Sequence, residues 1–171
     1  MITKLDSFVE SIIKIEKYLS THQLWLVAVV AVLFLISVLI GRKHNKSLFV
    51  LYILVILYLT LLNRNLGKRQ INLRLLWSYK HLFTNDYLRR EILNNVLLFI
   101  PLGTILSQIR PVWRAALIPV LISTGVELLQ FLTACGLFEL DDIISNSLGG
   151  LIGFAAGMLW IICKQILIIR S

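Results

Sequence analysis

IISNSLGGLIGFAAGMLWIIC, residues 143–163, is the stretch that decides the fold, because none of its 21 residues is charged. A helix needs about 20 predominantly apolar residues to cross the hydrocarbon core of a bilayer. Gly149, Gly153 and Gly157 recur every fourth residue and therefore share one helix face. Small residues at this spacing allow two membrane helices to approach closely. We therefore predict a membrane-spanning helix here that packs tightly against a neighbour.

Four further apolar stretches precede this helix, at residues 24–40, 48–62, 92–109 and 115–138. The whole chain is 58% hydrophobic and 15% charged, whereas soluble domains carry about 25% charged residues. The sequence therefore predicts an all-α fold, a polytopic integral membrane helical bundle of about five transmembrane helices. Pro101 lies inside the third of these stretches and is expected to kink it.

The chain divides into three regions by composition. In residues 1–62, apolar residues recur at three- and four-residue spacing over 3–20, which predicts an N-terminal amphipathic helix ahead of two anchoring transmembrane helices. A frayed polar tail is the alternative for 3–20. Residues 63–91 mix Arg and Lys with Trp and Tyr, which is typical of an interfacial loop, with room for a short helix. Residues 92–171 form the predicted three-helix core.

The net charge is +8, from 17 basic and nine acidic residues. The basic residues lie between the apolar stretches, so we interpret them as topology signals and contacts to lipid headgroups, and expect no nucleic-acid partner. Ten Lys and Arg residues fall on the side of the loop 63–91 and seven on the opposite side. The positive-inside rule alone would place that loop in the cytoplasm.

Glu127 is the only charged residue in the stretch 115–138. An ionisable side chain inside a span costs roughly 2.5–3.5 kcal/mol on insertion scales, so such a residue indicates a functional site by default. Gln130 follows three residues later and shares the same helix face. The alternative is a Glu127 that only joins two helices by hydrogen bonds.

Asp142 and Asn146 stand four residues apart, on the face that the glycines continue. Asp142 could instead cap its helix, and Asp141 could serve equally well. Asn146 could likewise be a simple interhelical hydrogen bonder.

The depth of these residues favours a single site. If the last two helices fold back about residues 136–137, Glu127 lies level with Asn146, and Gln130 lies level with residue 143. A fold about residues 111–112 brings Asn95 to the same depth. We therefore predict one water-accessible polar site, which combines amides and carboxylates: Asn95, Glu127, Gln130, Asp142 and Asn146.

Three runs in this part of the chain carry a family pattern: REILNNVLLFIPLG at 90–103, ELLQ at 127–130 and DIISNSLGG at 142–150, followed by Gly153. In this order they resemble the VanZ family, with its N-x-x-x-F-x-P-x-G, E-x-x-Q and D-x-x-x-N-x-x-G-x-x-x-G elements. The resemblance covers about residues 70–160 and places the five polar residues on motif positions. Two departures are NLRLL at 72–76, which lacks the family's proline, and CGL at 135–137, where many members carry an arginine.

The resemblance implies a multi-pass protein of the bacterial cytoplasmic membrane. It also implies a link to resistance against teicoplanin, a lipid-bearing glycopeptide that binds cell-wall precursors, or to homeostasis of the cell envelope. A role at the cell wall would place the loop 63–91 outside, and this is the orientation we adopt. The implied partners are the bilayer and a lipid-linked cell-wall precursor or lipoglycopeptide.

Three functions are compatible with these residues. The first is a non-enzymatic protein that binds a lipid-linked or lipidated ligand through Asn95, Gln130 and Asn146, with no cofactor. The second is an intramembrane enzyme acting on a polyprenyl-linked or phospholipid substrate, with Glu127 and Asp142 as acid and base, or with Asp142, Glu127 and Asn146 around Mg²⁺. The third is a small transporter or flippase.

Overall fold

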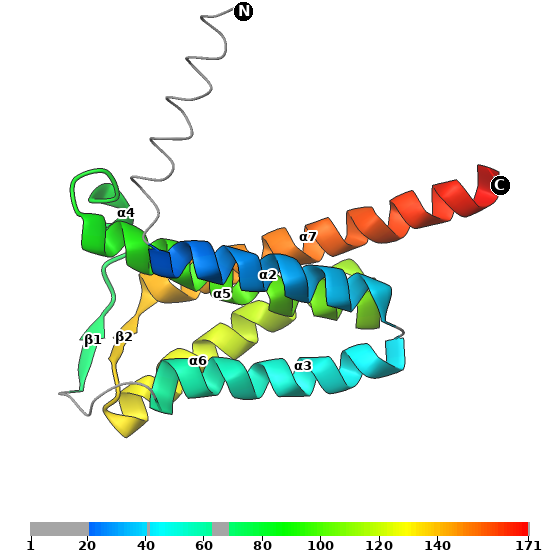
Figure 1. Ribbon diagram of the computed structural model, residues 1–171. Helices are drawn as coiled ribbons and strands as arrows, with labels where there is room; N and C mark the ends of the chain where they lie inside the picture. Colours follow the sequence, from blue (N-terminus) through cyan, green and yellow to red (C-terminus); the bar gives the residue numbers. More distant parts are fainter. Residues whose placement is uncertain (1–20, 41, 63–68, 171) are drawn as a thin grey trace, which may run out of the picture.

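The computed structural model describes residues 21–40, 42–62 and 69–170 (Figure 1). The amphipathic helix expected over 3–20 and residues 63–68 of the expected interfacial loop lie outside the described residues. The described elements are α2 (Thr21–Leu39), α3 (Arg42–Leu57), the π-helical η1 (Tyr58–Leu62), β1 (Gln70–Asn72), α4 (Trp77–Lys80), α5 (Asp86–Ile109), the 3₁₀ turn η2 (Trp113–Leu117), α6 (Ile118–Thr133), β2 (Leu137–Glu139) and α7 (Leu140–Arg170).

The expected all-α membrane bundle is confirmed. Four helical segments of the described chain are long and apolar enough to cross a membrane, namely Arg42–Leu61, Asp86–Ile109, Trp113–Thr133 and Leu140–Ile169. The first expected span corresponds to a shorter apolar helix, Trp25–Leu39. Many large apolar side chains on these helices are exposed, such as Leu121 at 70%, as expected for surfaces that face lipid rather than water.

Several expected helix boundaries were wrong, because polar residues at helix ends interrupt the apolar pattern without ending the helix. The expected span at 48–62 is part of a longer segment that begins at Arg42. The helix expected from residue 143 begins at Leu140 and continues to Arg170, so that its C-terminal part projects beyond the bundle (Figure 1). The helix expected from residue 115 begins at Ile118, after η2.

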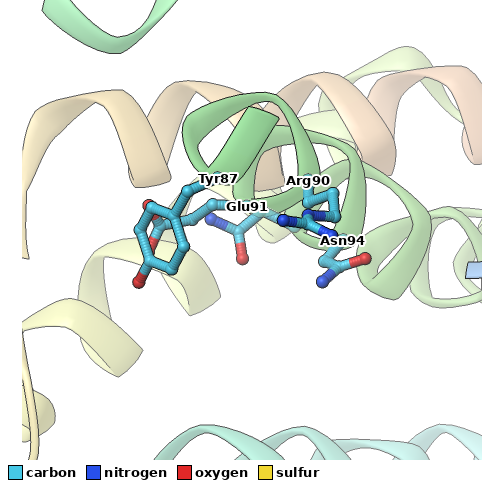
Figure 2. Close-up of a pocket in the computed structure, with 5 residues that line it drawn as sticks. Tyr87, Arg90, Glu91 and Asn94 are labelled. Atoms are coloured by element: carbon cyan, nitrogen blue, oxygen red, sulfur yellow. The ribbon is translucent and has the colours of Figure 1, made fainter. Parts of the chain in front are cut away.

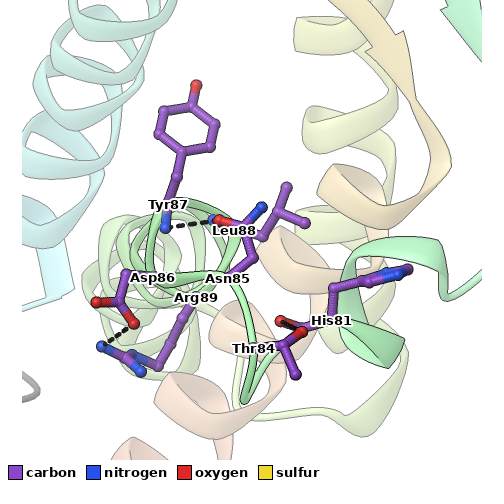
Figure 3. A network of polar contacts seen from close by, with 7 residues as sticks. All are labelled: His81, Thr84, Asn85, Asp86, Tyr87, Leu88 and Arg89. Carbon is purple, nitrogen blue, oxygen red and sulfur yellow. Dashed lines mark hydrogen bonds and ion pairs between the residues drawn. The ribbon is translucent and has the colours of Figure 1, made fainter.

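The third span also begins earlier than expected, at Asp86 instead of residue 92, because Asn85 caps it. The Asn85 side chain accepts hydrogen bonds from the backbone nitrogens of Tyr87 (3.0 Å) and Leu88 (3.3 Å). Asp86 pairs with Arg89 across the first turn, at 3.1 Å (Figure 3). An N-cap of this kind satisfies donors that have no partner inside the helix, so the polar sequence DYLRRE becomes helical.

A two-stranded parallel ladder joins distant parts of the chain at one end of the bundle. β1 pairs with β2 in the register Gln70↔Leu137, Ile71↔Phe138 and Asn72↔Glu139. This ladder replaces the expected helical exit at 134–138, because α6 ends at Thr133, its C-cap Ala134 has a left-handed backbone (φ 57°) and the chain continues to a strand. The short helix expected within 63–91 is present as α4.

α5 occupies the centre of the bundle, in contact with α2, α3 and α7. On one side, its buried residues Phe99, Leu102 and Ile105 pack with Tyr52 and Ile56 of α3. On the other side it packs most extensively against α7. The central helix α5 therefore forms the surface against which α2, α3 and α7 pack.

The glycines of α7 form the close seam with α5. A Cβ atom at Gly149 would overlap the carbonyl oxygen of Val96, and one at Gly153 would overlap that of Ile100. Thr104 of α5 donates to the carbonyl oxygen of Gly153, at 3.1 Å. The third glycine, Gly157, faces Ser107 in the same interface. The seam therefore lies between α5 and α7, and its hydrogen bonds need the close approach that glycine permits.

Candidate functional site

The five residues expected to form a site come from three helices near the end of the bundle that carries β1 and β2. Glu127 and Gln130 belong to α6, Asp142 and Asn146 to α7, and Asn95 to α5. Glu127, Gln130 and Asn146 are almost completely buried, with exposed fractions of 1%, 2% and 3%. We call these five residues the polar layer.

The predicted pairing of depths within the polar layer was wrong by about one helical turn. Asn146 donates from Nδ2 to Ser123 Oγ (3.0 Å), whereas Glu127 Oε2 accepts from the backbone nitrogen of Glu139 (3.1 Å). The reason is the early end of α6 at Thr133, which shifts the fold-back point toward the N-terminus. Asn146 therefore lies opposite Ser123, farther than Glu127 from the end of the bundle that carries β1 and β2.

Asp142 does not cap α7, because Glu139 precedes that helix and Asp142 lies inside its first turn. Instead, Asp142 belongs to an acidic trio with Glu91 of α5 and Glu139 of β2. One carboxylate oxygen from each lies within 4.8 Å of the others. Asn72 of β1 donates to Glu139 Oε1, at 2.9 Å. The strand ladder thus brings Glu139 to the site and orients it.

Oxygen ligands from three carboxylates match the preferences of Mg²⁺ and Ca²⁺. The acidic trio is the described group that could hold such an ion. Of the residues expected to bind Mg²⁺, only Asp142 belongs to it, while Glu127 contacts the backbone of Glu139. The trio also offers the close carboxylates that acid and base chemistry needs.

Each amide of the polar layer keeps one buried polar atom without a hydrogen-bond partner among the described residues. These atoms are Asn95 Nδ2, Gln130 Oε1 and Asn146 Oδ1, and Ser147 Oγ is in the same state. The opposite ends of two amides are satisfied, because Gln130 Nε2 donates to the carbonyl oxygen of Thr60 (3.1 Å) and Asn146 Nδ2 donates to Ser123. One end of the amide therefore holds Gln130 and Asn146 in place, while the other polar atom of each is buried without a partner among the described residues.

A cavity of about 340 Å³ opens beside the polar layer on the first turns of α5. It is lined by Tyr87, Arg90, Glu91, Asn94 and Asn95, and we call it the headgroup pocket. In Figure 2 the labelled side chains project from one side of α5. Glu91 belongs to both the pocket and the acidic trio, and Asn95 belongs to both the pocket and the polar layer. The pocket therefore adjoins both the acidic trio and the polar layer.

Asp141 fixes the segment that carries α4 against α7. Its two carboxylate oxygens accept from the backbone nitrogens of Leu76 (2.6 Å) and Ser78 (2.7 Å). Leu76 has a left-handed backbone (φ 58°), a conformation that costs a non-glycine residue about 1–2 kcal/mol. The alternative of Asp141 as a cap is therefore realised on α4 and not on its own helix.

Tyr79 of α4 adds a second link to α7. Its hydroxyl lies 2.8 Å from Ser145 Oγ, and Ser145 donates its own proton to the carbonyl oxygen of Asp141. Tyr79 must therefore be the donor to Ser145. Burial raises the pKa of the Tyr79 hydroxyl, its hydrogen bond with Ser145 lowers it, and the negative charges of Asp141 and Asp142 raise it. Tyr79 is thus a neutral donor at neutral pH.

Comparison with known proteins identifies the family of this chain. The sequence profile of the family described as VanZ/LLP1 matches residues 49–164. Protein VanZ of Enterococcus faecium is 30% identical over 123 residues, which cover 66% of this chain and 73% of that protein. The chain belongs to the VanZ/LLP1 family. No solved structure matches it.

The matched region of this VanZ/LLP1 protein contains the whole polar layer, the acidic trio and the headgroup pocket, whereas α2 precedes it. Sequence reasoning missed Glu91, Glu139 and Asn72 as members of the site. A signal for Glu91 was present, because it stands four residues before Asn95 on the same helix face. Glu139 and Asn72 could not be found in this way, because they meet only through the strand ladder.

Proposed function

We propose that the polar layer and the headgroup pocket bind the polar head of a lipid-anchored molecule at the surface of the bacterial cytoplasmic membrane. Binding of a lipid-linked cell-wall precursor, or of a lipoglycopeptide of the teicoplanin type, would lower susceptibility to that antibiotic. The observation that carries this proposal is the set of buried amide atoms without partners among the described residues. A buried polar atom left unpaired costs about 1–3 kcal/mol. Three neighbouring helices each carry such an amide atom in the polar layer, and a ligand that pairs with these atoms would offset that cost.

The chemistry of the lining supports a head with several hydrogen-bonding groups. Amides both donate and accept, carboxylates accept, and Arg90 contributes a fork of donors to the pocket. Sugars, phosphates and peptide groups offer complementary donors and acceptors. The similarity to Protein VanZ and the motif positions of the polar layer support the link to glycopeptide resistance.

The test replaces Gln130 by methionine, which has nearly the same shape and no amide. Gln130→Met leaves the carbonyl oxygen of Thr60 without its donor, which costs up to about 1–3 kcal/mol, so the abundance of the variant in the membrane is measured beside the phenotype. Cells that express it should become as susceptible to teicoplanin as cells without the protein. Gln108→Met is the matched control, because Gln108 donates to Gly157 within the helix seam, outside the site. Unchanged susceptibility of Gln130→Met at normal abundance would remove the proposal.

The acidic trio favours a second candidate, an enzyme that acts on a polyprenyl-linked or phospholipid substrate with a bound divalent cation. Here the test is direct binding of Mn²⁺ to the purified protein, followed by paramagnetic resonance. Asp142→Asn and Glu91→Gln should weaken Mn²⁺ binding at least about tenfold, or ~1.4 kcal/mol. If both variants bind Mn²⁺ as tightly as the wild type does, the trio is excluded as a metal site.

The proposed function requires the ladder end of the bundle to face outward. With five crossings, a reporter fused after residue 171 would then be cytoplasmic. An external reporter would contradict this orientation. The Lys and Arg of the outer loop would contact anionic lipid headgroups.

A further inference from the structure

A second cavity, lined mostly by apolar side chains of α2, α3, η1 and α5, has a volume of about 210 Å³. Leu26 and Leu33 mark its extent on α2, and Leu48 and Leu59 mark its extent on α3 and η1. The last two are 11 residues apart, which corresponds to about 16 Å along a helix. We call this cavity the apolar groove. Its length suits an extended chain rather than a compact molecule.

The floor of the apolar groove offers no free polar group. Tyr52 lines it, but the Tyr52 hydroxyl donates to the carbonyl oxygen of Leu98 at 2.7 Å. Only the ring of Tyr52 is left to face the groove. Leu51 and Val55 at its side are 58% and 39% exposed. Because both α2 and α3 are apolar along this stretch, the groove favours an occupant without polar groups.

The headgroup pocket and the apolar groove are both lined from one face of α5. Asn94 of the pocket follows Glu91 after three residues, and Leu98 of the groove follows Asn94 after four. Asn94 and Leu98 are thus separated by one helical turn, about 6 Å along the axis. Passing inward from the ladder end, α5 presents a polar cavity and then an apolar one. A lipid has the same order of groups along the membrane normal.

We propose that the apolar groove holds a hydrocarbon chain of the lipid whose head occupies the headgroup pocket. This inference rests on the proposed function and adds a binding element for the tail. One wall of the groove is α2, which precedes the region matched by the family profile. The N-terminal helices are therefore part of the binding site and not only anchors.

The test uses the full chain reconstituted in nanodiscs of phosphatidylglycerol, part of which carries a diazirine near the end of an acyl chain. The protein is washed in detergent before irradiation, so that only retained lipid can react. Labelled peptides should come from residues 25–39 and 48–59. Val55→Trp fills the groove and should lower this label about tenfold, and Leu51→Trp is a second variant in case the first does not fold. Leu121→Trp is the control, since Leu121 is exposed on α6 away from the groove.

Three outcomes would overturn the inference: label spread evenly over the lipid-exposed helices, equal label in Val55→Trp and wild type, or a crosslink between two copies through α2 and α3. The susceptibility of Gln130→Met is measured separately. If the groove is labelled but Gln130→Met has no effect on susceptibility, only the proposed headgroup role is removed. If Gln130→Met has a strong effect but the groove is not labelled, only the tail site is removed.

Discussion

Glu127 of α6 and Glu139 of β2 are joined by a hydrogen bond of 3.1 Å, in which the carboxylate of Glu127 accepts from the backbone nitrogen of Glu139. The bond holds the end of the strand ladder against the buried face of α6. It also leaves the side chain of Glu139 directed to the acidic trio. Glu127, which the sequence suggests as a catalytic residue, therefore also holds Glu139 in position.

This bond separates two substitutions of Glu127. Glu127→Gln retains an acceptor for the backbone of Glu139, so its free energy of unfolding should lie within about 1 kcal/mol of that of the wild type. Glu127→Ala loses the acceptor and should be less stable by about 1–3 kcal/mol. Chemical unfolding in detergent measures both. Equal stability of the two variants would show that the bond contributes nothing to the fold.

Gly153→Ala should destabilise the bundle, because its Cβ would overlap the carbonyl oxygen of Ile100 in the seam between α5 and α7. Forcing an extra methyl group into a packed interface costs typically about 1–3 kcal/mol. Gly125→Ala is the matched control, since a Cβ there meets nothing within 4 Å. That variant should be neutral or gain up to about 1 kcal/mol from helix propensity. Thermal unfolding of both variants in one detergent is the measurement, and a Gly153→Ala protein as stable as Gly125→Ala would refute the close seam.

Asp141→Ala should release the segment that precedes α5. The backbone nitrogens of Leu76 and Ser78 lose their carboxylate acceptor, so their amide hydrogens should exchange faster with solvent. Hydrogen bonds to a charged group contribute about 1.5–3 kcal/mol, which corresponds to more than tenfold in exchange protection. Asp86→Ala removes an exposed ion pair with Arg89 and serves as the control. Faster exchange at Leu76 in both variants would mean that Asp141 has no specific role.

Tyr79→Phe should change the pH dependence of stability. The pKa of Tyr79 is raised above its ordinary value of 10.0 in the folded protein, chiefly by burial. The folded state therefore keeps this proton when the unfolded chain loses it, and stability falls as pH rises above about 10. Tyr79→Phe should be less stable at neutral pH, where it lacks the bond to Ser145, and its stability should fall less steeply above pH 10. Parallel curves for the two proteins would contradict the assignment.

The membrane bundle could be predicted from the sequence, as could the helix face that each pair of polar residues shares, because both depend on local patterns. A charge-free stretch such as 143–163 specifies a span by itself. The spacing of Glu127 and Gln130, or of Asp142 and Asn146, places each pair on one helix face without knowledge of the rest. The family pattern, now confirmed, connected these pairs to Asn95.

The remaining features depend on long-range contacts that no local pattern encodes. Asn72 and Glu139 are 67 residues apart and meet only because two three-residue strands pair. The seam partner of the glycines could equally have been α6, and only packing selects α5. Asp141 illustrates the same limit, because its position suggested a cap on its own helix, whereas its carboxylate binds the backbone beside α4.

The parallel ladder also dictates when the site can exist during biosynthesis. β1 leaves the ribosome well before β2: the paired residues Asn72 and Glu139 are 67 positions apart, which at about 5–20 residues per second takes about 3–13 s to translate. During that interval the nascent chain carries an unpaired strand edge. Glu139 reaches Glu91 only when translation has passed β2, and Asp142 only when the last span has begun to emerge. A polypeptide truncated before that point can insert its earlier helices in the membrane, but it has no acidic trio.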